Sequence, residues 1–581
     1  MRILLLAHSF NSLVQRIFVE LGCDGHELSV ELDIHDRVTE EAVALFRPSM
    51  ILAPFLKRAI PAAVWQRHLC LVVHPGPPGD RGPSALDWAI LRGVGHWGVT
   101  VVQAGAEMDG GAVWASSSFA MRVATKSSLY RHEVTNGAVD AVRNAIARVM
   151  RGDPPLAIDN AKIEGEALGW QPAMKQADRA IDWMSDTTAD VLRKIRCADS
   201  APGIEDTLLG RRFRMFDARS DARISGAPGA VIAQAGGAIS RATTDGGVWI
   251  GQLQPVEGGR PGLKRSSVSA LGALADELRE IDGDPARDAR LAIDQVGAGE
   301  IRYEESGLVG SLHFDLYNGA LSTVQCERLR AAYARARRRP TRVIVLMGGA
   351  DFWCNGMHLH DIEAAPSPAE ASWANINGID DLAHDILTTD SHVTVAALQG
   401  NAAAGGDFLA LATDRVMARS TVVLNPHYRN MGNLYGSEYW TYLLPRRVGA
   451  EQANRLMDSR LPIGAAEAQA LGLIDDVAGP DGASFLAFVA TAARQMADDG
   501  VFEGVLEDKR VRRSRDEQVR ELASYRAEEL ERMRLNFFGF DPSYHIARHR
   551  FVHHAPIAWT PLHLARHRRV GFTLPVEESA S

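Results

Sequence analysis

The chain has 581 residues, enough for about three or four domains. Hydrophobic residues make up 46% of it and charged residues 23%, as in ordinary globular proteins, and its net charge of −9 argues against a general nucleic-acid binder. Five scattered cysteines without C-x-x-C spacing argue against a disulfide scaffold or a cysteine zinc site, and no apolar run is long enough to cross a bilayer. We therefore expect a cytoplasmic, multidomain enzyme without a membrane or nucleic-acid partner.

The first region, residues 1–165, alternates apolar runs with helical patterns. The runs at 3–7, 50–53, 70–73 and 99–103 have the length and composition of buried strands. Such alternation predicts a parallel sheet with helices on both faces.

A histidine and an aspartate stand where two of these strands end. His74 closes the run at 70–73, and Asp109 lies in a Met-Asp-Gly-Gly turn after the run at 99–103. Ligand sites of open α/β sheets lie at the carboxyl ends of strands, so we expect the two side chains to face each other. A histidine that titrates near neutrality beside a carboxylate suits proton transfer. The alternative is a capped core histidine and a turn aspartate.

The sequence around this pair resembles the N10-formyltetrahydrofolate-dependent formyltransferases. The shared features are His-Pro-Gly, an Arg-Gly loop, Trp-Ala-Ile and Asp-Gly-Gly, and the catalytic histidine and aspartate of that family fall on His74 and Asp109. The family's asparagine falls on Val72, so a side-chain donor to the oxyanion is missing here.

The resemblance implies N10-formyltetrahydrofolate as a cofactor. It places the pterin against Phe55 and Leu56, with Lys57 available to the glutamate tail. The loop residues that it assigns to the same pocket are Arg81, Gly82 and Gly110. The alternative for 55–57 is a hydrophobic loop start followed by a solvated lysine.

The pattern of apolar residues changes in residues 175–265. Short alternating runs separated by Gly/Asp-rich turns predict a small β-barrel. The order of Ile-Asp-Trp, Pro-Gly and Val-Trp-Ile-Gly-Gln-Leu resembles the C-terminal subdomain of methionyl-tRNA formyltransferase, which helps to hold the tRNA. No obvious basic surface accompanies the pattern, so we do not transfer tRNA binding. Residues 266–300 are predicted to be a linker with some helix.

A further domain is predicted at 301–500, with two glycine-bearing turns after buried strands. Backbone N–H groups at such turns can converge on one developing oxyanion. This region resembles the crotonase (enoyl-CoA hydratase/isomerase) superfamily, which implies coenzyme A as a ligand. The resemblance makes Met357 and Gly405 the oxyanion donors and assigns Gly356 and Gly406 to the ligand-binding turns. The alternative is that the glycines only permit tight packing.

The crotonase-like region lacks the glutamates with which hydratases add water. Phe408 and, approximately, His427 stand in their places, so we do not expect a hydratase. Tyr428 and Glu438 follow the second glycine turn, and Glu438 is the only carboxylate between residues 414 and 451. We assign Glu438 a proton-relay role and Tyr428 a hydrogen bond to the substrate. The alternative is that Glu438 caps the following helix and Tyr428 packs.

Residues 501–581 are predicted to be a helical extension with many charged residues. His545 and His549 share a helix face, but no acidic or cysteine partner is apparent, so no metal site is expected. A basic docking face for coenzyme A phosphates or a partner protein is the preferred interpretation of this tail.

Together these patterns predict an α/β protein with a formyltransferase-type parallel sheet, a small β-barrel subdomain and a crotonase-type domain with a helical tail. Over nearly its full length the chain resembles the HypX (HoxX) family of hydrogenase maturation factors. This resemblance implies formyl transfer from N10-formyltetrahydrofolate to coenzyme A, and breakdown of formyl-CoA to coenzyme A and carbon monoxide for NiFe hydrogenase. A formyltetrahydrofolate hydrolase and a non-catalytic folate and coenzyme A carrier remain as alternatives.

Overall fold

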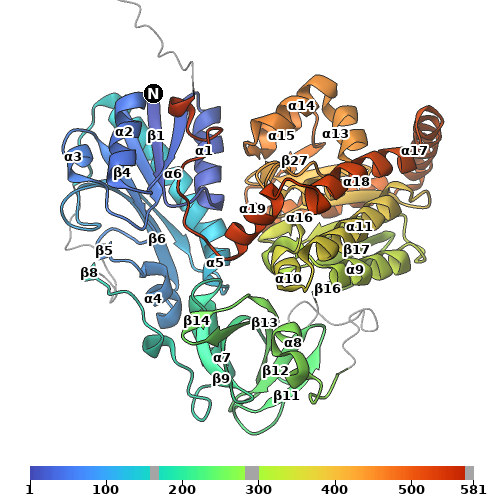
Figure 1. The fold of residues 1–581 in the computed structure, drawn as a ribbon, viewed down its shortest axis with the longest axis horizontal. Coiled ribbons are helices and arrows are strands. Elements are labelled where there is room, and N and C mark those ends of the chain that lie inside the picture. Colours follow the sequence, from blue (N-terminus) through green and yellow to red (C-terminus); the bar gives the residue numbers. More distant parts are fainter. Residues whose placement is uncertain (158–168, 282–299, 570–581) are drawn as a thin grey trace, which may run out of the picture. The chain divides into compact units, whose positions relative to one another are not determined.

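A computed structural model of the chain describes residues 1–157, 169–281 and 300–569 (Figure 1). Two compact units are distinguished: residues 1–178 together with the chain from residue 556, and residues 179–555. Among the described residues, no helix has both the length and the apolar character needed to cross a membrane.

Unit 1 is built on a six-stranded sheet of order β2-β1-β3-β4-β6-β7. Its inner strands are almost entirely buried because helices α2 and α3 pack on one face while α1 and α6 pack on the other (Figure 1). The strands are β1 (Arg2–Ala7), β2 (Glu27–Leu32), β3 (Met50–Phe55), β4 (Cys70–His74), β6 (His96–Gln103) and β7 (Val113–Ala120). The helices are α1 (Ser12–Cys23), α2 (Asp36–Phe46), α3 (Ala62–Trp65), α4 (Ala85–Arg92), α5 (Lys126–Leu129) and α6 (Thr135–Arg151).

The prediction of a wholly parallel sheet is wrong at one edge. β1 to β4 pair in parallel, but β6 pairs antiparallel with both β4 and β7. Between β4 and β6 the chain forms only the two-residue strand β5 (Asp80–Arg81) and the short helix α4, and apolar runs alone carry no information on strand direction. The carboxyl ends of β4 and β6 therefore lie at opposite edges of the sheet, so the argument from strand ends is wrong, although His74 and Asp109 do face each other.

The end of the described chain packs on unit 1. Leu564 accepts a hydrogen bond from Val30 in β2, and the buried Glu31 carboxylate pairs with His567 at 3.0 Å and Arg568 at 2.7 Å. In the described part of the predicted extension 501–581 the last α-helix is Ser543–Val552, and the basic residues His567 and Arg568 beyond it make internal contacts. Burial alone would raise the pKa of Glu31, but the hydrogen bonds from His567, Thr560 and Arg568 outweigh it, so the pKa is lowered.

The first part of unit 2 is an antiparallel sheet of order β11-β12-β13-β10-β9, to which β14 and β15 add at β13. It occupies the region of the predicted β-barrel. Of the predicted linker 266–300, residues 267–271 form helix α8 against the core of this sheet, and residues 282–299 lie outside the described chain. The elements are α7 (Thr188–Ala198), β9 (Ile204–Leu208), β10 (Arg211–Ser220), β11 (Val231–Ala235), β12 (Ala238–Ala242), β13 (Gly247–Glu257), β14 (Arg260–Pro261), β15 (Arg265–Ser266) and α8 (Ser267–Leu271).

The second part of unit 2 has a main sheet of order β16-β17-β19-β22-β24-β27 and a smaller sheet of order β20-β23-β25-β26. In the main sheet only β16 pairs antiparallel. The strands are β16 (Ile301–Ser306), β17 (Val309–Phe314), β18 (Ala320–Leu321), β19 (Val343–Gly348), β20 (Phe352–Cys354), β21 (Gly356–Met357), β22 (Val393–Leu398), β23 (Asn401–Ala403), β24 (Arg415–Arg419), β25 (Val423–Asn425), β26 (Ile463–Gly464) and β27 (Asp476–Ala478).

Helices surround these two sheets and complete the core of unit 2. The long helices α11 and α18 pack together (Figure 1). α11 also contacts α12, which begins at the second glycine turn, and α18 contacts α13. The helices are α9 (Thr323–Ala336), α10 (Leu359–Ala364), α11 (Pro368–Leu387), α12 (Gly405–Leu411), α13 (Trp440–Val448), α14 (Ala450–Ser459), α15 (Ala465–Ala470), α16 (Gly482–Met496), α17 (Asp499–Val519), α18 (Leu522–Phe538) and α19 (Ser543–Val552).

Candidate active sites

The first candidate site is a histidine between two carboxylates in unit 1. His74 ends β4 and is buried, with Nε2 2.7 Å from Asp80 Oδ2 and Nδ1 3.4 Å from Asp109 Oδ2. A protonated imidazole donates to both carboxylates, whereas a neutral one donates to only one of them. The arrangement therefore suits a group that accepts and returns a proton during a reaction.

Backbone geometry, rather than strand direction, brings Asp109 to His74. Asp109 has a left-handed φ of 54°, in the loop after β6, and its Oδ2 accepts a hydrogen bond from the Gly82 N–H at 3.1 Å. Gly76 permits the close approach of the third group, because a Cβ there would overlap Asp80 Oδ2 and lie 2.6 Å from His74 Nε2. Asp80 was missed in the sequence, although it stands only six residues after His74 in a Pro-Gly-Asp-Arg-Gly loop.

The other predicted folate residues lie around this pair in different environments. Phe55 ends β3, which pairs in parallel with β4, and its ring lies 6.3 Å from that of Tyr130. Leu56 packs against the apolar cluster under the sheet, while Lys57 is exposed.

The predicted loop residues gather beside Asp109. Arg81 Nη1 lies 3.3 Å from Glu107 Oε2, and a Cβ at Gly110 would lie 3.2 Å from the same guanidinium nitrogen. The positively charged side chain of Arg81 thus lies beside the loop that contains Asp109.

The second candidate site is the meeting point of the two glycine turns in unit 2. A Cβ on Gly356 would lie 3.3 Å from the backbone nitrogen of Gly405, so the turn carrying Met357 and the start of α12 lie against each other. Gly406 is equally constrained, since a Cβ there would overlap the Cys354 carbonyl. The N–H of Gly405 belongs to the first turn of a helix, where no carbonyl four residues earlier in the helix accepts it.

Glu438 lies directly over this glycine. A Cβ on Gly405 would overlap Glu438 Oε1, while Glu438 Oε2 lies 2.6 Å from the Tyr428 hydroxyl. The Tyr428 ring stacks on Phe408, which is predicted from the sequence to replace a hydratase glutamate, with 5.2 Å between ring centroids. The other such position, His427, is buried.

The contacts of Tyr428 connect it to Glu438. The tyrosine hydroxyl donates to Glu438 Oε2 at 2.6 Å and lies 2.9 Å from Ser437 O. The Ser437 N–H donates to the same carboxyl oxygen at 3.2 Å. Burial, and next the neighbouring Asp380, raise the pKa of Glu438 well above its ordinary range.

Two further buried carboxyl groups, which were not identified in the sequence, support Glu438. Asp380 accepts hydrogen bonds from the Glu438 N–H and the Ser437 hydroxyl, both at 2.8 Å, and burial raises its pKa to about 6. Glu529 accepts from the Tyr439 and Thr441 N–H groups at the start of α13, and burial raises its pKa to about 8. Glu529, and not Glu438, therefore caps α13.

Three residues next to Gly405 and at Glu438 have left-handed backbone angles. Ala404, immediately before Gly405, has φ 50°, and Glu438 and Tyr439 have φ 58° and 61°. Residues with a Cβ adopt such angles at a cost of about 1–3 kcal/mol each, and the surrounding structure must hold them there. Asp380 and Glu529 come from α11 and α18, far away in the chain, so no local sequence signal marks them.

Comparison with known proteins agrees with the two halves described above. The family "Formyl transferase, C-terminal domain" matches residues 173–261, and the family "Enoyl-CoA hydratase/isomerase" matches residues 314–532. Methionyl-tRNA formyltransferase of Burkholderia multivorans is 28% identical over 234 residues, 40% of this chain and 65% of that protein.

Two proteins are similar over the whole chain. Hydrogenase maturation factor HoxX of Bradyrhizobium diazoefficiens is 52% identical over 571 residues, 98% of this chain and 97% of that protein. The crystal structure of HypX from Aquifex aeolicus in complex with tetrahydrofolic acid is 45% identical, with a TM-score of 0.92, and the match covers 99% of this chain and 100% of that one. The predicted fold class is confirmed.

Proposed function

Since this chain belongs to the HypX and HoxX family of hydrogenase maturation factors, we propose that it makes carbon monoxide for NiFe hydrogenase in two steps. The first step transfers a formyl group from N10-formyltetrahydrofolate to coenzyme A. The second breaks formyl-CoA down to carbon monoxide and coenzyme A. We place the first reaction in residues 1–165, followed by the subdomain 175–265, and the second in residues 301–500. The partners are folate, coenzyme A and the hydrogenase maturation machinery.

For the formyl transfer we assign His74 as the proton-transfer group. The thiol of coenzyme A loses a proton as its sulfur attacks the formyl carbon, and the folate nitrogen gains one as it leaves. A single imidazole that is held by Asp80 and Asp109 can perform both transfers. The missing asparagine at Val72 leaves the oxyanion to backbone N–H groups and to water. The folate pocket is assigned to Phe55 and its neighbours.

For the second step we assign Tyr428 and Glu438 as a proton relay. Breaking formyl-CoA requires removal of the formyl proton and return of a proton to the thiolate sulfur, so the sum of protons is unchanged. A carboxylate whose pKa is raised is a stronger base than an ordinary glutamate, which suits removal of the formyl proton. The N–H groups of Met357 and Gly405 would stabilise charge on the thioester oxygen.

One observation carries the proposal most directly. The Glu438 carboxyl lies against Gly405, in a crotonase-type unit whose hydratase glutamate is replaced by Phe408. A site without the glutamates that activate water in the hydratases favours an elimination without water over hydration.

The decisive experiment detects carbon monoxide in the gas phase. Purified protein is incubated with coenzyme A and N10-formyltetrahydrofolate labelled at the formyl carbon, and the expected result is labelled carbon monoxide that depends on both substrates. Labelled formate that forms without coenzyme A would instead identify a formyltetrahydrofolate hydrolase. Binding of both ligands without turnover would identify a carrier.

A further inference from the structure

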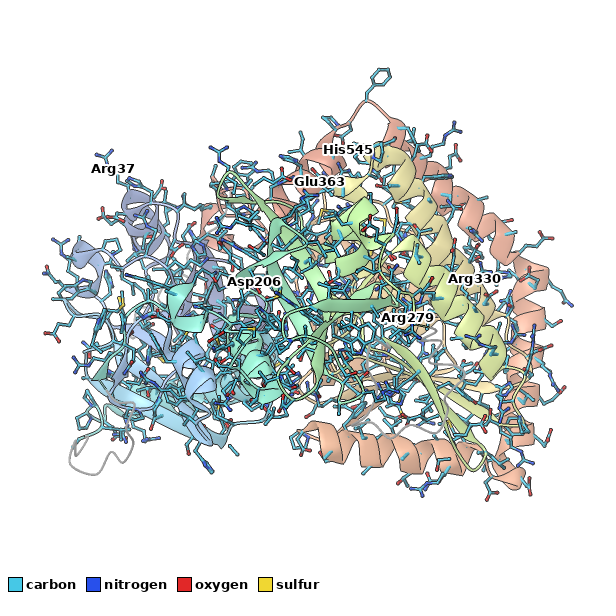
Figure 2. All side chains as sticks on the ribbon, turned by 90° about the horizontal axis from the view of Figure 1, so that it is seen from below. Arg37, Asp206, Arg279, Arg330, Glu363 and His545 are labelled. Carbon is cyan, nitrogen blue, oxygen red and sulfur yellow. The ribbon has the colours of Figure 1, made fainter. Side chains whose placement is uncertain are left out.

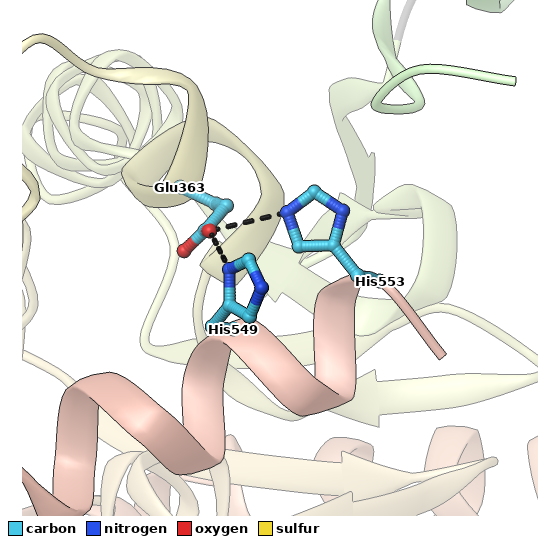
Figure 3. Close-up of side chains that lie close together, drawn as sticks. All are labelled: Glu363, His549 and His553. Carbon is cyan, nitrogen blue, oxygen red and sulfur yellow. Dashed lines mark hydrogen bonds and ion pairs between the residues drawn. The ribbon is translucent and has the colours of Figure 1, made fainter. Parts of the chain in front are cut away.

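A carboxylate and two imidazoles that have no role assigned above meet on the surface of unit 2. Glu363 of α10 lies with Oε1 2.7 Å from His549 Nδ1 and 3.2 Å from His553 Nε2 (Figure 3). The two histidines are four residues apart, at the end of α19, so they project from the same helix face. The three ligand atoms all lie within 4.8 Å of one another.

The carboxylate is held so that one oxygen faces the imidazoles. Arg548 is almost buried, and its Nε lies 2.8 Å from Glu363 Oε2, which leaves Oε1 for the two histidines. Glu363 is therefore a preoriented carboxylate whose Oε1 faces both imidazoles.

The pair considered in the sequence, His545 and His549, is not the one that the fold provides. His545 Nε2 lies 2.9 Å from the Phe537 carbonyl, and His545 Nδ1 lies 2.7 Å from Arg548 Nη1, so both ring nitrogens are engaged. His545 instead supports Arg548, which donates to Glu363. Figure 2 labels His545 and Glu363. The acidic partner that the sequence did not reveal comes from α10, 186 residues away from His549.

We propose that Glu363, His549 and His553 bind a divalent transition metal ion, with zinc as the best-suited candidate. Imidazole and carboxylate are ligands that zinc takes at about 2.0–2.2 Å, and three protein ligands plus water is a common zinc set. This proposal does not depend on the proposed function.

Small side-chain movements convert the cluster into that set. Ligand atoms of a tetrahedral zinc site lie about 3.3 Å apart, as follows from the bond lengths. The contact of Glu363 with His553 already has this length, and the contact with His549 must open by about half an ångström. The side chains of His549 and His553 are 60% and 43% exposed, so they are free to make this adjustment.

The position of the site suggests its effect. α10 begins two residues after Met357, the first assigned oxyanion donor, and Glu363 lies near the end of this short helix. A metal ion bound to Glu363 and the two histidines would tie α10 to α19. The ion would thereby hold the segment that follows the glycine turn, and we assign it a structural role.

Zinc titration of the full-length protein tests the proposal. After removal of metal with a chelator, calorimetry with Zn²⁺ alone should detect one ion per chain, and bound zinc should raise Tm. His553→Ala and Glu363→Gln should each weaken zinc binding by about tenfold or more. Because the His549 side chain is exposed, His549→Gln provides a further variant that leaves the fold intact.

The adjacent histidine offers a matched control. His554 has φ 49°, an angle that asparagine tolerates, so His554→Asn removes a neighbouring imidazole with little backbone strain. The affinity of this variant for zinc should equal that of the wild type. Equal affinity in the wild type, His549→Gln and His553→Ala would overturn the proposal. So would a loss in His554→Asn as large as that in His553→Ala, which would indicate a histidine-rich tail that binds without a defined site.

Discussion

The two candidate active sites use different side chains for proton transfer, and these side chains lie in different surroundings. In unit 1 an imidazole lies between two carboxylates, one of which, Asp109, is partly exposed. In unit 2 a tyrosine and a carboxyl group form the central pair, and Glu438 is only 1% exposed.

This difference matches the chemistry proposed for each site. Formyl transfer moves a proton between a thiol and an amine, for which a histidine near neutrality is suited. Decarbonylation returns the proton that it takes, and water would divert formyl-CoA to formate. A buried carboxyl group whose pKa is raised by burial fits a site from which water is excluded.

The largest expected effect separates the two sites most cleanly. His74→Ala should lower consumption of formyl-folate by ~10²–10⁴ or more, because the imidazole moves the protons while the loop makes the pocket. Asp109→Asn should be nearly as severe. Folate binding should be retained in both variants, as measured by fluorescence titration. Wild-type turnover in either variant would contradict the assignment.

Chemically made formyl-CoA bypasses unit 1 and tests unit 2 alone. Glu438→Gln should slow the release of carbon monoxide from this substrate by ~10²–10⁴, because the amide cannot relay a proton. His74→Ala should release it at the wild-type rate. If both variants behave alike on formyl-CoA, the division of labour between the two sites is wrong.

The next largest effect is expected for substitution of Gly405, which lies against the Glu438 carboxyl group. A Cβ on Gly405 would overlap Glu438 Oε1, so even Gly405→Ala should displace the carboxyl group and narrow the oxyanion site. We expect a loss of ~10²–10³ in the rate with formyl-CoA, and Gly405→Val should abolish it. Circular dichroism and Tm serve as controls for folding. Unchanged carbon monoxide output from a folded Gly405→Val protein would count against a crotonase-type site.

A smaller effect is expected at Tyr428. Tyr428→Phe keeps the ring that stacks on Phe408 but removes the hydroxyl that contacts Glu438. The rate with formyl-CoA should fall by about tenfold to a hundredfold, as for loss of one hydrogen bond to a reacting group. A rate equal to that of the wild type would reduce Tyr428 to a packing residue.

The smallest effect concerns stability rather than rate. The pKa of Glu529 is about 8 in the folded protein, above its value in the unfolded chain, so the folded state binds this proton more tightly. Stability must therefore fall as pH rises from about 4.3 towards 8. Glu529→Gln stays neutral and should flatten this decline, by on the order of 1 kcal/mol or more. Calorimetric Tm values of both proteins at pH 5.5 and 8 measure this decline. If Tm falls equally in the wild type and in Glu529→Gln, titration of Glu529 is not its cause.

Much of the fold follows from local patterns. The apolar runs at 3–7, 50–53 and 70–73 correspond to β1, β3 and β4, since strands buried on both faces need uninterrupted apolar residues. The direction of β6 did not follow, because strand direction is set by pairing between segments and not by composition.

For the candidate sites, too, the sequence determined one part and the tertiary structure the other. The sequence by itself determined which residues stand at the ends of these elements. His74 closes β4, and Gly405 begins α12. Only the tertiary structure decided what surrounds them, because Asp380, Glu529 and Glu363 lie on helices far away in the chain from the residues that they contact. Burial, and therefore the pKa of Glu438, is also a property of the packed core, and no single segment specifies it.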